Sequence, residues 1–253
     1  MAEKTSIIKY KLAYARQREQ VLTGASYHLR RCRRVMWYLE TLTFSVRYLQ
    51  WIESKIGGEN MRYKRFSYRE KLWFRAVMPA LCSAGKQIEG FEFGVASGRA
   101  TQWWHSNLLN LKSWKGFDTF EGLPTAWSRG GVSVMEKGVF APSNPSIPYP
   151  VIDQACEINW HRGLIEETLP SIMRKTDCVL IVLIDVDLYE PTRAVLDWLL
   201  LNGLPGDCIY FDEAFDAFNE GKALREIIEE GLRFEILGFT GSGLAIRLTE
   251  RAG

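Results

Sequence analysis

Apolar runs and amphipathic segments alternate along most of the chain after about residue 85. Residues 179–184 are consecutive apolar side chains, many of them β-branched, a pattern typical of a strand buried on both faces. Runs of this kind predict strands at 88–93, 114–118, 156–161, 178–185, 207–212, 234–240 and 243–248. A helical period of the apolar residues predicts helices at 99–111, 166–175, 191–201 and 220–230.

This alternation predicts an α/β fold with a doubly wound, mostly parallel sheet. The last two strands are divided by a Gly-Ser-Gly turn at 241–243, so we expect an antiparallel hairpin to close the sheet. Residues 119–150 are rich in glycine and proline. Because this connection is too long for a turn, it is a candidate substrate-binding loop.

The N-terminal region has a different pattern, which predicts mostly helical structure and includes no proline before Pro79. A helix expected at 27–54 has aromatic side chains on one face, and further apolar residues widen that surface. We expect this surface to be covered by the rest of the chain or by a second subunit. The sequence therefore predicts a helical extension over 1–80, acting as a lid or in homo-oligomerisation, and a catalytic domain over 81–253.

Charge is unevenly distributed although the net charge is only +2. The first 75 residues carry 17 Lys and Arg against 6 Asp and Glu, a net charge of +11, and the remainder carries −9. The basic cluster at 30–34 is either the solvated face of a helix or a patch that binds phosphate or lipid. Because no nucleic-acid-binding motif accompanies it, we do not expect a nucleic-acid partner.

The five cysteines show no metal-type spacing, and Cys178 and Cys208 fall in predicted buried strands. Reduced, packed thiols are typical of a cytoplasmic protein, which is the location we expect. The first residues have no apolar segment behind their charges, so we expect no signal peptide. Charged Glu40 and Arg47 interrupt the apolar stretch at 35–52, so we expect no membrane span.

Acids and glycines follow the first two predicted strands of the sheet. Glu92, Gly94 and Gly98 lie at a strand-to-helix junction, where glycines allow a tight turn and a close ligand. This spacing alone suits a packing turn equally well. Asp118 ends the next strand, where an acid can accept hydrogen bonds from ribose hydroxyls. Two acids disfavour a phosphate and favour a cationic ligand such as S-adenosylmethionine.

A second group of acids follows two later strands. Asp185 and Asp187 end the run at 179–184, and Asp212 and Glu213 end the strand after it. If these strands are neighbours, the acids converge, and an oxygen-binding cation such as Mg²⁺ is the natural counterion. Such an ion could lower the pKa of an acceptor hydroxyl, and Asp187 could take its proton. The alternative is that these acids only end strands and cap helices.

Five blocks of sequence between about 85 and 215 resemble the macrocin O-methyltransferase family. They are the segments 91–98 (FEFGVASG), 116–124 (GFDTFEGLP), Gly163 with 167–170 (ETLP), 184–192 (IDVDLYEPT) and 211–213 (FDE). The resemblance implies a class I S-adenosylmethionine-dependent methyltransferase fold, with a seven-stranded sheet that ends in an antiparallel hairpin. Members of this family methylate sugar hydroxyls of natural products and typically require Mg²⁺.

The resemblance also assigns roles to individual residues. It places Glu92, Gly94 and Asp118 at cofactor-binding positions, and we also expect Ser97, Thr119, Gly163 and Asp185 to bind the cofactor. It places Asp185, Asp212 and Glu213 at metal positions. It places Asp187 at the position proposed for the general base, and we also expect Asp185 to take part in catalysis.

The chain departs from the family at the metal site. Glu213 stands where the family usually has Asp, and Leu183 stands where it often has His. Two other interpretations therefore remain beside a sugar O-methyltransferase. One is a catechol-type metal-dependent O-methyltransferase, and the other is a non-catalytic protein of the same fold that binds an anionic partner through its basic N-terminal helices.

Overall fold

The computed structural model describes residues 64–129, 132–141 and 156–250, and seven separate positions between 39 and 51. The chain divides into two compact units, Met1–Phe44 and Ser45–Gly253, and the fold below is that of the second. Most of the helix predicted at 27–54 and all of the basic cluster at 30–34 lie outside the described residues. The described positions of that helix are helical, and Leu39 and Leu42 are exposed.

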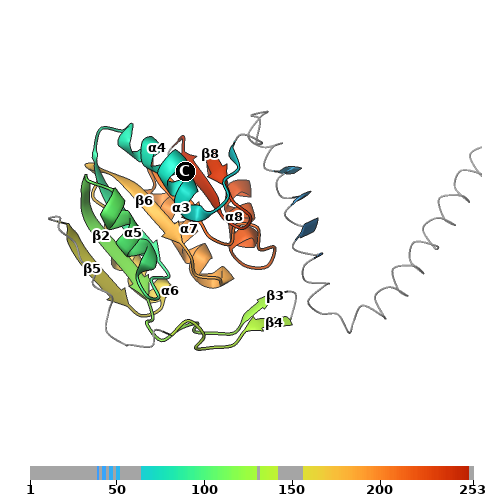
Figure 1. The fold of residues 1–253 in the computed structure, drawn as a ribbon. Coiled ribbons are helices and arrows are strands. Elements are labelled where there is room, and N and C mark those ends of the chain that lie inside the picture. Colours follow the sequence, from blue (N-terminus) through green and yellow to red (C-terminus); the bar gives the residue numbers. More distant parts are fainter. Residues whose placement is uncertain are drawn as a thin grey trace, which may run out of the picture. The chain divides into compact units, whose positions relative to one another are not determined.

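A seven-stranded sheet forms the centre of the second unit (Figure 1), in the order β5-β2-β1-β6-β7-β9-β8. The strands are β1 (Gln87–Phe93), β2 (Leu111–Asp118), β5 (Glu157–Arg162), β6 (Cys178–Ile184), β7 (Cys208–Phe211), β8 (Phe234–Phe239) and β9 (Leu244–Leu248). The pairs among β5, β2, β1, β6 and β7 are parallel. Strand β9 pairs antiparallel with β7 and β8. The predicted α/β sheet and its closing hairpin are confirmed.

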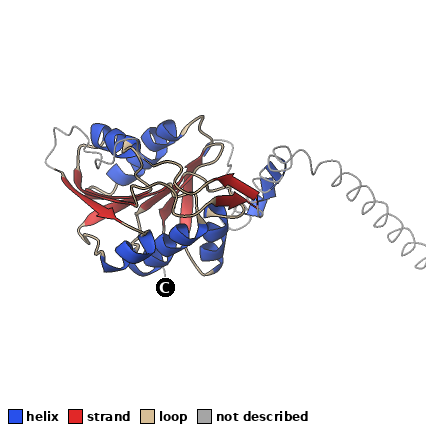
Figure 2. Ribbon diagram, turned by 90° about the horizontal axis from the view of Figure 1, so that it is seen from below, coloured by secondary structure: helices blue, strands red, loops and turns tan. Residues whose placement is uncertain are grey.

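Helices cover both faces of the sheet (Figure 2). They are α3 (Arg69–Leu72), the π-helix η2 (Trp73–Val77), α4 (Met78–Cys82), α5 (Arg99–Asn107), α6 (Ile165–Thr168), the 3₁₀ helix η3 (Leu169–Ser171), α7 (Tyr189–Asn202) and α8 (Glu220–Glu229). The prediction of a long helix at 166–175 is wrong. Pro170 has no amide hydrogen to continue the α-helical bonds, and the chain changes there to a single 3₁₀ turn.

The segment before β1 packs into the core through Trp73, which is 1% exposed. Its ring centroid lies 5.0 Å from that of Trp103, 5.5 Å from that of Trp104 and 5.2 Å from that of Tyr210. Buried aromatic groups of this kind fix neighbouring elements firmly, because they remove a large apolar area from water. Residues 69–82 are therefore anchored on the sheet. The extension predicted over 1–80 stays a prediction.

The candidate substrate loop contains a hairpin that the sequence pattern did not predict, formed by β3 (Trp127–Arg129) and β4 (Val132–Met135). Trp127 lies in a small apolar cluster with Leu123 and Leu188. The strands are too short to give a clear alternating pattern. The hairpin therefore depends on contacts with distant parts of the chain.

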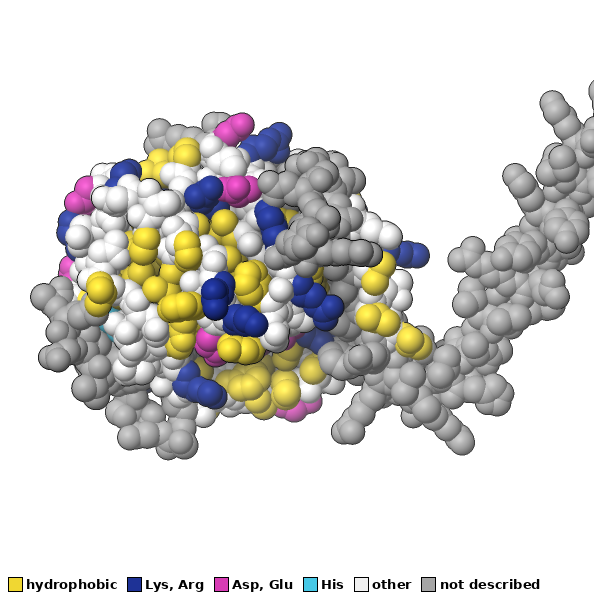
Figure 3. Space-filling view, turned by 45° about the horizontal axis from the view of Figure 1, so that its top comes forward, with side chains coloured by type: hydrophobic (Ala, Val, Ile, Leu, Met, Phe, Trp, Pro, Cys, Tyr) yellow, Lys and Arg dark blue, Asp and Glu magenta, His cyan; other side chains and the backbone are white. Residues whose placement is uncertain are grey.

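Part of the surface of the second unit is apolar. Tyr68 and Phe74, on the segment before β1, are both more than half exposed, at 57% and 54%. On the face shown in Figure 3, hydrophobic side chains lie among Lys and Arg side chains. The predicted homo-oligomer stays a prediction.

Within the described ranges, no helix combines the length and the hydropathy needed to cross a membrane.

Candidate active site

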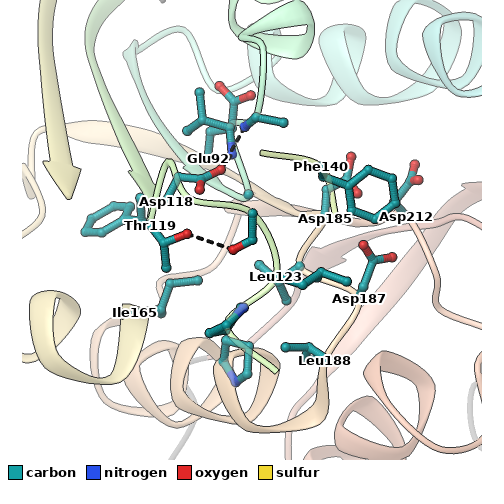
Figure 4. A pocket seen from close by; sticks show the side chains of 18 of the residues that line it. Glu92, Asp118, Thr119, Leu123, Phe140, Ile165, Asp185, Asp187, Leu188 and Asp212 are labelled. Carbon is teal, nitrogen blue, oxygen red and sulfur yellow. Dashed lines mark hydrogen bonds between the residues drawn. The ribbon is translucent and has the colours of Figure 1, made fainter. Parts of the chain in front are cut away.

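A cavity of about 490 Å³ lies at the carboxyl ends of β1, β2, β6 and β7. In open parallel sheets this is where ligands bind, at the point where the strand order reverses. All the site residues expected from the sequence line the cavity: Glu92, Gly94, Ser97, Asp118, Thr119, Gly163, Asp185, Asp187, Asp212 and Glu213. Figure 4 shows Glu92 and Asp118 on one side and Asp185, Asp187 and Asp212 on the other.

The turn after β1 brings the backbone of β1 against that of β6. Gly94 has a φ of +86° and Gly98 a φ of +72°, which glycine adopts without strain. A Cβ at Gly94 would lie 1.8 Å from the carbonyl oxygen of Asp185. Gly94 is therefore required for packing between the strands, and the turn it forms lines the cavity.

The Asp118 carboxylate holds this turn in place. Its Oδ2 accepts hydrogen bonds from the amides of Val95 (2.8 Å) and Ala96 (2.7 Å), and its Oδ1 accepts one from Phe120 (2.7 Å). A carboxylate has about four acceptor positions. Within the described part of the chain, these three donors leave one acceptor position, on Oδ1, and ribose recognition by Asp118 stays a prediction.

Glu92 is the most deeply buried acid on the cofactor side, with 1% of its surface exposed. Its Oε2 accepts hydrogen bonds from the Thr101 hydroxyl and from Trp114 Nε1, the latter at 2.9 Å. Its Oε1 has no hydrogen-bond partner within the described part of the chain. Burial raises the pKa of Glu92 to about 7. An acceptor without a partner beside a cavity is a natural contact for a ligand that donates hydrogen bonds.

This pKa makes the stability of the ligand-free protein depend on pH. The pKa of Glu92 is about 7 in the fold against an ordinary value of 4.5, so the folded state binds more protons than the unfolded state. The raised pKa values of Asp187 and Glu213 act in the same direction, and we expect Glu92 by itself to lower the free energy of unfolding by about 3 kcal/mol as the pH rises through this range. Glu92→Gln should remove this loss, whereas the exposed Glu121→Gln should keep it. Urea unfolding at pH 4.5, 6 and 7.5 measures both, and an unchanged slope in Glu92→Gln would contradict the assignment.

The acids after β6 and β7 converge around an arginine. Ile184 pairs with Phe211, which confirms that the two strands are neighbours and places Asp185 beside Asp212. Arg69, the first residue of α3, donates from one nitrogen, Nη1, to Asp185 Oδ2 at 3.0 Å and to Asp212 Oδ1 at 3.2 Å. Arg69 was not among the predicted site residues, because nothing in the pattern around residue 69 indicates that it meets acids more than a hundred residues away.

Glu213 pairs with a different arginine, Arg129. Its Oε2 accepts a hydrogen bond from Arg129 Nη2 at 3.1 Å, and Arg129 Nε donates to Asp216 Oδ2 at 2.9 Å. Asp216 also accepts from Trp127 Nε1 at 3.2 Å and from Asn219 Nδ2 at 2.9 Å. These bonds fix the β3–β4 hairpin against the loop that follows β7. The candidate substrate loop therefore forms a wall of the cavity.

Asp187 is held in an unusual backbone conformation, with a φ of +62°. The buried Glu220 stabilises it, because Oε1 accepts hydrogen bonds from the amides of Val186 (3.1 Å) and Asp187 (3.2 Å) and Oε2 accepts one from Glu213 (3.0 Å). The sequence shows Glu220 only as the first residue of a helix. Burial, and then the Asp212 carboxylate, raises the pKa of Asp187 to about 6.

The three predicted metal ligands do not form a metal site in this arrangement. Among the residues that the structure describes, no group of three or more His, Cys, Asp and Glu side chains is placed to hold a metal ion. Asp185 and Asp212 share the Arg69 guanidinium, and Glu213 pairs with Arg129. Mg²⁺ is held in proteins by one or two carboxylates that are free to bind it, with water making up about six oxygen ligands at about 2.1 Å. The residues present therefore do not fit the ion as they stand.

The remaining predicted residues shape the cavity wall. Thr119 Oγ1 donates to the Gly122 carbonyl at 2.9 Å, and Gly163, with a φ of +138°, donates its amide to the Asp118 carbonyl at 3.1 Å. Ser97 lies in the turn after β1. Their contacts with a cofactor stay predictions.

Comparison with known proteins identifies solved structures that have a similar fold. No protein-family model and no curated protein matches the chain. The calicheamicin methyltransferase CalS11 superimposes with a TM-score of 0.51 at 20% identity, over 76% of this chain and 97% of that one. The chain has the fold of class I methyltransferases. Membership of the macrocin family itself stays a prediction.

Two further solved structures are similar at lower scores. The O-methyltransferase NovP has a TM-score of 0.47 at 16% identity, over 72% of this chain and 80% of that one. An O-methyltransferase from Bacillus cereus, in complex with SAH, has a TM-score of 0.42 at 14% identity, over 82% and 91% of the two chains. At these identities, what these proteins bind and methylate is stated of them alone.

Proposed function

We propose that this protein is an S-adenosylmethionine-dependent O-methyltransferase that acts on a hydroxyl group of a small molecule. The observation that carries the proposal is a cavity that has a buried acid on one wall and a group of acids on the other. The methyltransferase fold supports it. A fold alone does not establish an activity, so the proposal depends on these side chains.

The first wall suits the cofactor, which when bound supplies an electrophilic methyl group on a cationic sulfonium. Among the described residues, one buried oxygen of the Glu92 carboxylate has no partner, and it can accept hydrogen bonds from an ammonium or a hydroxyl group. Asp118 and the turn at 94–98 line the same wall. We propose that Glu92, Gly94, Ser97, Asp118, Thr119 and Gly163 bind the cofactor.

The second wall suits the acceptor and its proton. With a pKa of about 6, the Asp187 carboxylate is ionised at neutral pH and remains basic enough to act in proton transfer. The acceptor hydroxyl would give its proton to Asp187 while its oxygen forms a bond to the methyl carbon. The bond from that carbon to sulfur breaks, and its electron pair stays on sulfur. Charge is then conserved, since the sulfonium becomes a neutral thioether.

The acceptor class is proposed from the walls of the cavity and from the resemblance. Apolar side chains of Leu123, Phe140 and Leu188 line the acceptor side (Figure 4), which suits a molecule with an apolar part. CalS11 is described as a TDP-rhamnose 3'-O-methyltransferase, and the five sequence blocks imply sugar hydroxyls. We propose a glycosylated natural product, with catechols as the alternative class that an acceptor panel would distinguish.

Mg²⁺ is the part of the sequence prediction that the side chains support least. The sequence places Asp185, Asp212 and Glu213 at metal positions, whereas in the structure these groups pair with two arginines. We therefore assign no step of the proposed reaction to a metal ion. The non-catalytic alternative depends on the basic cluster at 30–34, which lies outside the described residues.

Calorimetric titration tests the proposed function most directly. We expect S-adenosylmethionine and its demethylated product to bind with one site per chain, and Glu92→Gln to weaken binding by about tenfold or more, as expected for the loss of a charge-assisted hydrogen bond. The exposed Glu121→Gln serves as the matched control. If the wild-type protein binds neither compound, the function is not that of a methyltransferase.

A further inference from the structure

We propose that the guanidinium of Arg69 is the fixed cation of this active site and occupies the position in which the sequence predicts Mg²⁺. The inference rests on the proposed function for its catalytic meaning, but the occupancy of the position can be tested without turnover. It concerns three side chains, namely Arg69, Asp185 and Asp212.

The geometry shows one donor atom shared between two acids. Arg69 Nη1 is 3.0 Å from Asp185 Oδ2 and 3.2 Å from Asp212 Oδ1, so it bridges the carboxylates that end two adjacent strands. A divalent ion that bridged the same two oxygens would lie within contact distance of this nitrogen and would carry the same sign of charge. Arg69 and a metal ion therefore exclude each other at this position.

Other bonds keep further ligands away from the position. Asp212 Oδ1 accepts a second hydrogen bond, from the Tyr210 hydroxyl at 2.7 Å. Glu213 is engaged by Arg129, whose other bond to Asp216 holds the hairpin. Turning Glu213 toward the two aspartates would break its ion pair with Arg129. One oxygen of each carboxylate, namely Asp185 Oδ2, Asp212 Oδ1 and Glu213 Oε2, thus accepts a hydrogen bond from an arginine.

The position of Arg69 is determined by core packing. Arg69 begins α3, four residues before the buried Trp73, and its guanidinium carbon lies 5.3 Å from the centre of the Trp73 ring. Cation–π contact of this kind adds to the two ion pairs. An arginine side chain also stays charged at every pH at which proteins are folded. The site therefore has a permanent positive charge without a bound ion.

This charge has a definite use in the proposed reaction. Arg69 lines the cavity together with Asp187, so an acceptor oxygen can lie near the guanidinium while its proton goes to the carboxylate. A fixed donor placed where negative charge develops stabilises the transition state and needs no reorganisation. Burial, and then repulsion from Asp212, raises the pKa of Asp185, and the charge of Arg69 opposes part of that rise.

Metal binding tests the occupancy of the position. Mn²⁺ is titrated into the full-length protein and followed by electron paramagnetic resonance and calorimetry. We expect the wild type to show no site tighter than about 1 mM, and Arg69→Met to gain one at least tenfold tighter, since it keeps the apolar stem but frees two carboxylates. Arg75→Ala, which removes an exposed arginine of the same segment, should behave as the wild type. Arg69→Gln is a second neutral variant, in case Arg69→Met does not fold.

Turnover gives a second, separate measurement. Wild-type activity should be unchanged by a chelator, and Arg69→Met should lose about 100-fold in kcat and regain part of it when Mg²⁺ is added. A tight Mn²⁺ site in the wild type, loss of wild-type turnover in the chelator, or no Mn²⁺ site in either neutral variant would overturn the proposal. A wild type that transfers no methyl group to any acceptor would refute the proposed function instead, while the Mn²⁺ titration would still decide the occupancy.

Discussion

Replacing Asp187 with asparagine should lower kcat by about 10²- to 10⁴-fold, the usual contribution of a general base. Asparagine has nearly the same shape as aspartate and tolerates a positive φ, which matters because residue 187 has a φ of +62°. The backbone bond from residue 187 to Glu220 does not involve the side chain. The substitution therefore removes the base without disturbing its position. Steady-state assays with S-adenosylmethionine and a saturating acceptor measure the loss.

Two controls show whether the loss comes from proton transfer. Asp177→Asn removes an exposed aspartate immediately before β6, at the end of that strand opposite to the site, and should leave kcat unchanged. Cofactor binding to Asp187→Asn, measured by calorimetry, should equal that of the wild type, since Glu92 and Asp118 are intact. An Asp187→Asn protein with wild-type kcat would show that another group takes the proton.

Replacing Gly94 with alanine should be the most destabilising single substitution among the predicted site residues. Its Cβ would lie 1.8 Å from the carbonyl oxygen of Asp185, so the ends of β1 and β6 would have to separate. We expect a loss of about 3–5 kcal/mol in the free energy of unfolding, the range reached when packed backbone is forced apart. Cofactor binding should be lost with it, because this turn lines the cavity. Urea unfolding and calorimetry measure the two effects.

Gly206 provides the matched control for this substitution. Its φ is +97°, similar to the +86° of Gly94, but the nearest atom to its Cβ would be 4.0 Å away, on the side chain of Val179. Gly206→Ala should therefore cost only the strain of the backbone conformation, about 1–2 kcal/mol. Equal losses in the two variants would mean that the close approach to Asp185 contributes nothing.

The prediction of the sheet succeeded because each strand carries its own signal. Strand β6 (Cys178–Ile184) is buried at every position, and a run of apolar residues is what such a strand requires. The same local logic placed α7 and α8 within two residues of their observed bounds. It failed at residues 166–175, where Pro170 ends the α-helix early, and at the β3–β4 hairpin, whose short strands are held by Asp216.

The candidate site was likewise predicted only in part. The sequence placed Asp185, Asp187, Asp212 and Glu213 after two successive strands, because position along a parallel sheet determines which edge a residue reaches. That the two strands are neighbours was a condition of the prediction, and the pairing of β6 with β7 meets it. The partners of these acids were not visible, since Arg69 and Arg129 lie in segments without a motif. The sequence thus predicted a group of carboxylates that needs a positive counterion. Mg²⁺ was inferred as this counterion because the acids were considered without Arg69 and Arg129.

By itself, the amino-acid sequence determined the α/β sheet, the order of its elements and the set of acids at its carboxyl edge. These features follow from the spacing of apolar residues within each segment and from the alternation of strands and helices that builds a parallel sheet. Only the tertiary structure showed that Arg69 bridges Asp185 and Asp212. It also showed that Arg129 forms an ion pair with Glu213 and that Glu220 accepts a hydrogen bond from the Asp187 amide. These contacts join segments up to 143 residues apart, and electrostatic pairing over such separations leaves no local pattern in the chain.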